Sequence, residues 1–376
     1  MDDLAQLLSE LVAIDSTNPS LAPGAPGEEA LARFLARRMD AMGLEVDLWE
    51  AAPGRPNVVG RLPGSGEGRS LVFLGHLDVV APWSSDAFKP RITDGRMYGR
   101  GAADMKSGLA AALVAIEALT QDHPLAGDVY FAGVIDEEWA SLGTQAFLSR
   151  YHPDAAVIPE CTDLTIVSEH GGFAWYEIES HGVEAPGVDS DHGVDAISLL
   201  APVLVGLTRL DAELAQRPHA SYGRASVHAS TIEGGKQFPA YPARCVLGVE
   251  RCLIAGETVD QAQAELDDII AAARAADPRF RGELRTVVAR QPLTQSPDEP
   301  VVAAASAAVS RVLGRPTVVH GDIAWGDSGL LAENGIPCAT FGPIGRGEHT
   351  AEEWVDLSSV ASTAAALAVT AQEFCR

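Results

Sequence analysis

Three short apolar runs in the first half of the chain are each followed at once by histidine or acidic side chains. Leu71–Leu74 leads to His76 and Asp78, Val129–Ile135 leads to the acidic triplet 136–138, and Ala155–Ile158 leads to Glu160. An unbroken apolar run of this length is typical of a strand that is covered on both faces. In open α/β sheets, ligands bind beyond the carboxyl ends of the strands. The pattern therefore predicts a buried sheet with a polar, chemically active edge.

Segments with helical periodicity alternate with these strands. An amphipathic first helix is expected because Leu4, Leu7, Leu8, Leu11 and Val12 repeat with helical spacing. Further helices are expected over residues 28–42, 107–119, 299–313, 328–334 and 357–374, and further strands over 46–49, 57–62, 317–320 and 337–341. This alternation predicts the α/β class, with a mixed sheet covered by helices on both faces in an α/β/α arrangement.

The pattern changes between residues 173 and 287. Phe173–Ser180 alternates as a half-exposed antiparallel strand does. It is followed by an expected helix over 194–214, strands over 225–232 and 245–254, and a helix over 258–275. This order predicts an inserted α+β (βαββα) domain over residues 173–287. The larger domain would then be discontinuous, made of residues 1–172 and 288–376.

Composition argues against several classes of partner. The chain has 376 residues and a net charge of -25, which opposes binding to nucleic acids and anionic membranes. No apolar run approaches the length of a membrane span, and the acidic N-terminus lacks the features of a signal peptide. The five cysteines show no CxxC spacing and fit reduced thiols. We therefore expect a cytoplasmic protein with neither nucleic-acid nor membrane partners.

Five separate stretches supply the side chains that a pair of metal ions needs. Their residues are His76 with Asp78, Asp104, Glu137 with Glu138, Glu160 and His349. Imidazoles and carboxylates in this mixture are typical ligands of two zinc-like ions bridged by one carboxylate. Taken singly, each has a simpler interpretation: Asp104 could cap a helix, the acidic triplet could be a solvated turn, and His349 could be a surface residue of a polar loop. Neither a P-loop nor a GxSxG nucleophile motif is present.

Longer motifs follow one another along most of the chain. They are LVFLGHLDVV (71–80), MYGRGAADMKSGLAA (97–111), IDEEWASLGTQAFL (135–148), STIEGG (230–235) and FGPIGRGEHTAEEWVDL (341–357). Together these motifs resemble the zinc amidohydrolase and exopeptidase family that holds acetylornithine deacetylases, succinyl-diaminopimelate desuccinylases, aminoacylases and glutamate carboxypeptidases.

The resemblance implies a ligand assignment for two divalent cations. His76 and Glu160 would bind one cation, Glu138 and His349 would bind the other, and Asp104 would bridge both, with a cis peptide bond to the next residue. Zinc is favoured by the mixture of histidine and carboxylate ligands, although cobalt or manganese can occupy such sites.

The resemblance also implies catalytic and substrate-binding roles. Asp78 would orient His76, and Glu137 would be the general acid/base. Arg251 matches an arginine that pairs with a substrate carboxylate, and a surface arginine on a strand is the equally weighted alternative. The inserted domain would be a lid, which in many members also forms a homodimer contact.

Two departures from the family pattern lie in the predicted lid. Pro186 stands where the family has a histidine, and Pro239–Pro242 replaces a turn that usually contains asparagine. Proline cannot donate a hydrogen bond to an oxyanion. We expect either that His192, His219 or His228 substitutes, or that the substrate or the turnover is changed.

The motifs therefore predict a metal-dependent hydrolase that cleaves the amide bond of an N-acyl amino acid or small peptide. A carboxypeptidase or dipeptidase of the same fold is the alternative within enzymes. A protein that retains the metal ions as a binding protein with reduced hydrolytic activity is the alternative outside them.

Overall fold

The computed structural model describes residues 2–121 and 125–376. The chain forms two compact units. One consists of Met1–Ser168, Gln295–His320 and Gly326–Arg376, and the other of Glu169–Thr294 and Gly321–Trp325. The larger unit is thus built from segments that are far apart in the sequence, on either side of a long insertion.

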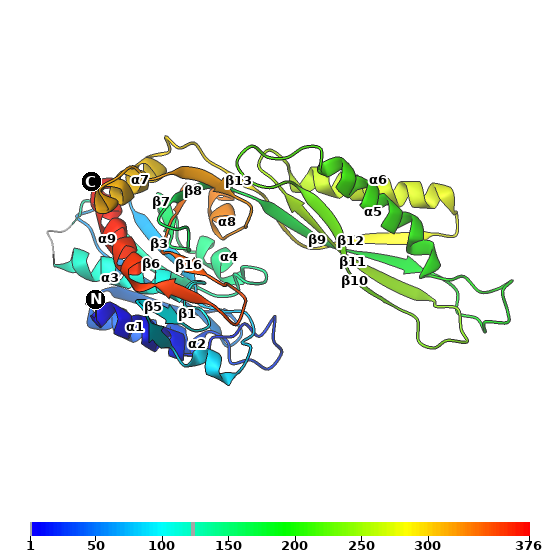
Figure 1. Cartoon of the computed structure of the whole chain (residues 1–376), viewed down its shortest axis with the longest axis horizontal. Coiled ribbons are helices and arrows are strands. Elements are labelled where there is room, and N and C mark those ends of the chain that lie inside the picture. The colour runs from blue at the N-terminus through cyan, green and yellow to red at the C-terminus, as the bar shows by residue number, and fades with distance from the viewer. Residues whose placement is uncertain (1, 122–124) are drawn as a thin grey trace. The chain divides into compact units, whose positions relative to one another are not determined.

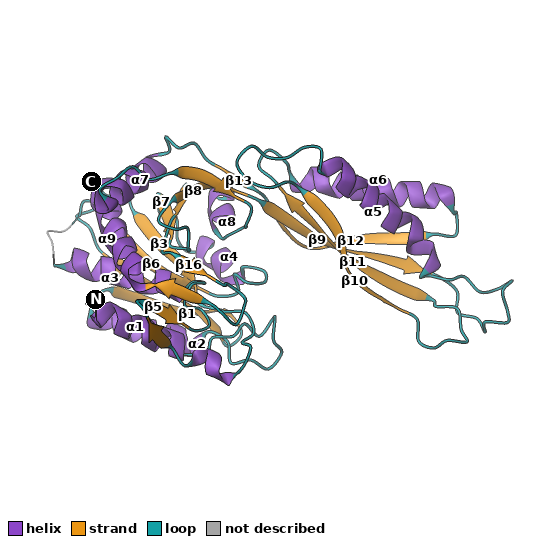
Figure 2. Cartoon of the chain, in the orientation of Figure 1, coloured by secondary structure: helices purple, strands orange, loops and turns teal. Residues whose placement is uncertain are grey.

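A mixed sheet forms the centre of the larger unit (Figures 1 and 2). Its strand order is β1-β2-β6-β3-β7-β15-β8-β13, with β14 paired to β8. The strands are β1 (Glu45–Ala52), β2 (Arg55–Leu62), β3 (Leu71–His76), β6 (Val129–Val134), β7 (Ala155–Ile158), β8 (Ile166–His170), β13 (Leu293–Thr294), β14 (Val319–Asp322) and β15 (Cys338–Thr340). Strands β6, β3, β7 and β15 are mutually parallel neighbours. Their carboxyl ends therefore meet at one edge of the sheet, as the apolar runs predicted.

Helices cover both faces of this sheet. Helices α2 (Glu29–Ala41) and α3 (Lys106–Thr120) share one face, because Gly60 of β2 lies against Met39 and Gly75 of β3 lies against Leu109. Three more helices, α1 (Asp2–Ala13), α7 (Pro300–Leu313) and α9 (Leu357–Phe374), contribute to the same apolar core. On the opposite face, Asn57 donates a hydrogen bond to the carbonyl of Gly143 in α4 (Leu142–Leu148), and α8 (Ser328–Glu333) packs beside α4. The predicted α/β/α arrangement is confirmed.

Gly108 allows an unusually close approach between α3 and the turn after β7. A Cβ atom at this position would lie 2.0 Å from the carbonyl oxygen of Pro159. Only glycine leaves room for that approach. As a result, the start of α3 packs directly against the turn that carries Glu160.

A small antiparallel sheet joins two further segments of the larger unit. Its order is β16-β17-β5-β4, from β4 (Arg91–Thr93), β5 (Arg96–Tyr98), β16 (Gly345–Arg346) and β17 (Trp354–Asp356). Trp354 pairs with Tyr98 across β17 and β5. These short strands were not expected, and they bring the loop before α3 beside the loop that follows β15.

The smaller unit is a four-stranded antiparallel sheet with two helices. Its elements are β9 (Gly172–His181), α5 (Ala201–Leu214), β10 (Ser226–Gly234), β11 (Arg244–Leu253), α6 (Val259–Ala276) and β12 (Arg281–Arg290), and its strand order is β10-β11-β9-β12. Buried and half-buried residues alternate along β9 as the sequence predicted. The buried side chains pack against α5 and α6 in a core that includes Tyr176, Leu207 and Leu266.

Two details of this unit differ from the sequence expectation. Strand β12 runs to Arg290, so the unit has one strand more than the predicted βαββα order and extends past residue 287. This strand is an edge strand with exposed Glu283 and Arg285, and its charged side chains hid it from the hydrophobic pattern. Helix α5 begins at Ala201 rather than near Val194, with Pro202 in its first turn, the position that proline favours.

Across residues 2–121 and 125–376, every helix is too short or too polar to cross a lipid bilayer.

Candidate metal centre

The predicted ligands gather at the carboxyl edge of the parallel strands. His76 is the last residue of β3, Glu138 follows β6, and Glu160 follows β7. His349 lies in the loop between β16 and β17, and Asp104 lies just before α3. Segments that are far apart in the sequence thus converge on Asp104.

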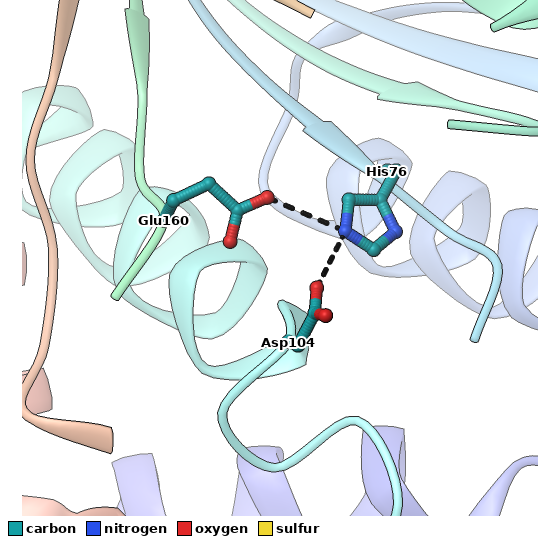
Figure 3. Close-up of side chains that lie close together, drawn as sticks. All are labelled: His76, Asp104 and Glu160. Atoms are coloured by element: carbon teal, nitrogen blue, oxygen red, sulfur yellow. Dashed lines mark hydrogen bonds and ion pairs between the residues drawn. The ribbon is translucent and has the colours of Figure 1, made fainter. Parts of the chain in front are cut away.

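One group of donors forms around the imidazole of His76 (Figure 3). Its Nε2 atom lies 2.9 Å from Oδ1 of Asp104 and 3.3 Å from Oε1 of Glu160. Its Nδ1 atom lies 2.9 Å from the backbone oxygen of Asp78. A carbonyl oxygen only accepts, so Nδ1 carries a proton and Nε2 is the ring nitrogen that faces the two carboxylates.

A second group forms around the imidazole of His349. Its Nε2 atom lies 3.0 Å from Oδ2 of Asp104 and 3.1 Å from Oε2 of Glu138. Within each group the ligand atoms all lie within 4.8 Å of one another. Asp104 gives one carboxylate oxygen to each group, which is the arrangement that a bridging ligand requires. The peptide bond between Asp104 and Met105 is cis, as the resemblance implied.

Two residues at this edge adopt left-handed backbone conformations although they are not glycine. Asp136 has φ of 69° and His349 has φ of 62°. Such conformations cost free energy and persist where the surroundings impose them, often at functional sites. Both residues lie in loops that carry predicted ligands, so the strain is concentrated at the candidate centre.

Closely packed acids and imidazoles shift one another's pKa values. Burial raises the pKa of Glu138 to about 7, and burial also raises the pKa of Glu160. Hydrogen bonds to Asp104 and Glu138 raise the pKa of His349 to about 10. Although burial acts in the opposite direction, hydrogen bonds to Asp104 and Glu160 raise the pKa of His76. The pKa values of these four groups are therefore all raised by burial or by one another.

The donor set suits two divalent cations. Each group offers one imidazole nitrogen and two carboxylates, one of them shared. Nitrogen and oxygen donors in this mixture are typical zinc ligands, and cations would offset the repulsion between the buried carboxylates. The residues present therefore fit a two-metal centre.

Asp78 contacts His76 as predicted, but in an unexpected way. Its backbone oxygen, rather than its carboxylate, accepts the hydrogen bond from His76, and its Oδ1 atom lies 3.7 Å from Nδ1. The carboxylate accepts the backbone N–H groups of Glu137 at 3.1 Å and Glu138 at 3.2 Å. Asp78 therefore fixes the loop after β6 as well as the ring of His76.

Glu137, the predicted general base, lies in the loop after β6, directly before the predicted ligand Glu138. Its carboxylate accepts no hydrogen bond from the residues that the structure describes. Burial raises its pKa well above the usual value, while His76 acts in the opposite direction and Asp327 adds to the increase. Asp327 is a buried carboxylate at the start of α8 that accepts a hydrogen bond from Thr144 at 2.6 Å. A raised pKa makes the carboxyl group a better proton acceptor, which suits the predicted role of Glu137 as general acid/base.

A buried network behind this loop was missed from the sequence. Arg55 of β2 pairs with Glu28 and lies 2.9 Å from Oδ1 of Asp136. Asn18 donates to Asp78 at 2.8 Å and to Asp136 at 3.2 Å. All five side chains are buried. Arg55, just before the strand expected over 57–62, and a polar segment after the first helix were the available signals, and neither reveals its partner.

Arg251 lies in the smaller unit with its guanidinium buried. It forms ion pairs with Glu257 at 2.9 Å and with Glu265 at 3.0 Å, and it also donates to the carbonyl of Cys252. Its side chain is 1% exposed. The surface-arginine alternative is therefore wrong, and binding of a substrate carboxylate stays a prediction.

The three histidines predicted to substitute for the one replaced by Pro186 all have acidic neighbours within the smaller unit. His192 lies 2.7 Å from Asp189, His219 lies 3.4 Å from Glu169, and His228 lies 3.6 Å from Glu250. Which of them acts in catalysis, if any does, stays a prediction.

The two departures from the expected pattern lie side by side in the smaller unit. Pro186 forms a β-bridge with Ala240, and Tyr241 donates its backbone N–H to the carbonyl of Ala185 at 2.8 Å. A replacement in one of the paired segments therefore directly affects the other.

Comparison with known proteins relates the chain to a family. The model of peptidase family M20/M25/M40 matches residues 72–373. N-formyl-4-amino-5-aminomethyl-2-methylpyrimidine deformylase of Bacillus subtilis is 29% identical, over 91% of this chain and 87% of the relative. Acetylornithine deacetylase of Myxococcus xanthus is also 29% identical, over 99% of this chain and 97% of the relative. Among solved structures, the YXEP protein of Bacillus subtilis, a dinuclear metal binding peptidase, superposes with a TM-score of 0.73 at 17% identity, covering 99% of this chain and 98% of that one.

Proposed function

The chain belongs to peptidase family M20/M25/M40, a family of hydrolases that act on amides and peptides, and from this premise we propose a reaction and a class of substrate. The enzyme removes a small acyl group from an amine by hydrolysis of an amide bond. His76 and Glu160 hold one divalent cation, Glu138 and His349 hold a second, and Asp104 bridges them. The observation that carries this proposal is the division of the two Asp104 oxygens between the two imidazoles, at 2.9 and 3.0 Å.

The side chains of the site have distinct tasks in this reaction. When bound, the cations supply Lewis acidity, which polarises the amide carbonyl and lowers the pKa of water. Glu137 takes a proton from the attacking water and passes it to the departing amine. Its raised pKa favours both halves of this transfer, because the carboxyl group can hold the proton between them. Asp78 keeps Glu137 and Glu138 in register through their backbone N–H groups.

The two curated relatives support a small acyl group rather than a long peptide. One is named for removing a formyl group and the other for removing an acetyl group. We propose an N-acyl amino acid, or a related N-acylated amine, as the substrate. A small peptide, cleaved by a carboxypeptidase or dipeptidase activity, is the alternative. If Arg251 binds a substrate carboxylate, it must first exchange Glu257 or Glu265 for it, since both now occupy its guanidinium.

A substrate panel with matched variants tests the reaction. The panel holds N-formyl and N-acetyl amines with and without a carboxylate, together with dipeptides, and it is assayed with zinc, cobalt and manganese. Glu137→Gln is expected to lower kcat by about 10²–10⁴-fold while retaining two bound ions. Glu138→Gln, its neighbour, is expected to lose an ion. Equal turnover by wild type and Glu137→Gln would exclude the mechanism. Wild type that binds two ions but turns over no member of the panel would favour a metal-retaining binding protein.

Three further features belong to the same proposal. Zinc is the favoured metal because of the mixed imidazole and carboxylate donors. The five free cysteines fit a cytoplasmic location. Strand β10 is an edge strand of the smaller unit with an exposed Ile232, and it is a suitable surface for a homodimer contact. Light scattering of the purified protein tests the last point.

A further inference from the structure

A buried ion pair joins the two loops that carry Asp104 and His349. Glu353 lies four residues after His349, and its side chain is fully buried. One of its carboxylate oxygens accepts the backbone N–H of Ala103 at 3.0 Å and that of Asp104 at 3.2 Å. The other oxygen pairs with the guanidinium of Arg100, which is 3% exposed. A single side chain from the His349 loop thus holds the two successive backbone N–H groups that lead into Asp104.

Further contacts between the same loops surround this pair. Arg100 reaches the carbonyl of Thr350 at 3.5 Å, and the N–H of Gly99 donates to the carbonyl of Glu353 at 3.2 Å. Strands β5 and β17 pair immediately beyond these residues. The connection is therefore anchored on both sides, and the relative position of the two loops is fixed near the candidate centre.

Stability alone does not explain why an ion pair occupies this place. Removing two charges from water is costly, and a buried ion pair is often no more stabilising than apolar side chains of the same size. The pair also adds no net charge to the site, because Arg100 offsets Glu353. The ion pair instead fixes the position of two ligands. Glu353 accepts the backbone N–H of Asp104, and it lies in the same loop as His349.

We propose that Arg100 and Glu353 are positioning residues that hold Asp104 and His349 at the spacing needed to share a cation. They set the affinity of the second ion, which Glu138 and His349 bind, and they affect the ion at His76 and Glu160 far less. This inference rests on the proposed two-metal function. The sequence gives no direct sign of it, since Arg100 and Glu353 are 253 positions apart.

Metal binding by the full chain tests this role without relying on turnover. Protein freed of metal by a chelator is titrated with Zn²⁺ against a chromophoric chelator, and with Co²⁺ while its visible absorption is followed. Wild type is expected to bind two ions. Glu353→Gln keeps the size of the side chain but turns an amide group toward Arg100, so we expect the second ion to bind about 10–100-fold more weakly. The first ion should change by less than about threefold.

Two more variants complete the experiment. Arg100→Lys keeps the charge but loses the planar fork, so an intermediate loss at the second ion is expected. Glu352→Gln changes an exposed neighbour in the same loop and should match wild type. Circular dichroism and thermal unfolding establish that each variant is folded, and if Glu353→Gln does not fold, Arg100→Lys decides. Folded Glu353→Gln or Arg100→Lys with two wild-type affinities overturns the positioning role. Wild type that binds no ions overturns the proposed function itself.

Discussion

The carboxylate of Asp78 accepts the backbone N–H of Glu137 at 3.1 Å, so the predicted general base is held by the residue that also orients His76. In Asp78→Asn, the amide group faces backbone N–H groups that need an acceptor, and the loop after β6 loses one of its contacts. We expect kcat to fall by about 10–100-fold, with a smaller change in KM. Asp40→Asn, an exposed substitution, is the control, and steady-state kinetics give the comparison. Wild-type kcat in Asp78→Asn would show that the loop does not depend on this contact.

Arg55 is the cation that offsets Glu28 and Asp136 behind the same loop. In Arg55→Met, both carboxylates remain buried without their positive partner. The free energy of unfolding is expected to fall by about 3–5 kcal/mol, the usual cost of removing one member of a buried pair. Urea denaturation followed by circular dichroism measures the change, with the exposed Arg37→Met as the control. A loss below about 1 kcal/mol would mean that the carboxylates are neutral or find other donors.

For Gly108→Ala, helix propensity and packing predict opposite changes in stability. Alanine is favoured over glycine inside a helix by about 1 kcal/mol. The close approach to Pro159 at 2.0 Å instead predicts that Gly108→Ala lowers stability by about 1–3 kcal/mol and weakens zinc binding, because the turn that carries Glu160 must shift. Gly187→Ala is the control, since its nearest backbone atoms lie at 3.6 Å. Thermal unfolding measures the outcome. If Gly108→Ala is more stable than wild type, helix propensity outweighs the close contact with Pro159.

The buried His170 should make the protein less stable in mild acid. Burial lowers its pKa to about 4, whereas an exposed histidine titrates near 6.5. Between these pH values the unfolded chain binds a proton that the folded chain does not, so its contribution to stability falls as pH falls from about 6.5 to 4. The loss reaches at most about 3 kcal/mol. His170→Gln should therefore gain on wild type as pH is lowered, while the exposed His152→Gln should not. A difference in stability between His170→Gln and wild type that does not change with pH would contradict the lowered pKa of His170.

The sequence was most informative where a feature of the fold depends on the pattern of a single strand or helix. Apolar runs predicted β3, β6 and β7, and parallel pairing then explains why His76, Glu138 and Glu160 share an edge. Asp104 and His349 were candidates from their residue types, but the resemblance was needed to assign their roles, because no periodic pattern shows that the loops before α3 and after β15 meet. Buried partners such as Arg55 with Asp136, or Arg100 with Glu353, could not be predicted, because each pair joins elements whose contact only the completed fold creates. Strand β12 was missed because its edge position permits charged side chains.

The central claim is that Asp104 is shared between two cations, and anomalous scattering tests it most directly. A crystal grown with zinc and measured on both sides of the zinc absorption edge is expected to show two peaks about 3.5–4 Å apart. One peak should lie beside His76 and Glu160, the other beside Glu138 and His349, with Asp104 between them. A single peak, or two peaks that do not both contact Asp104, would contradict the account.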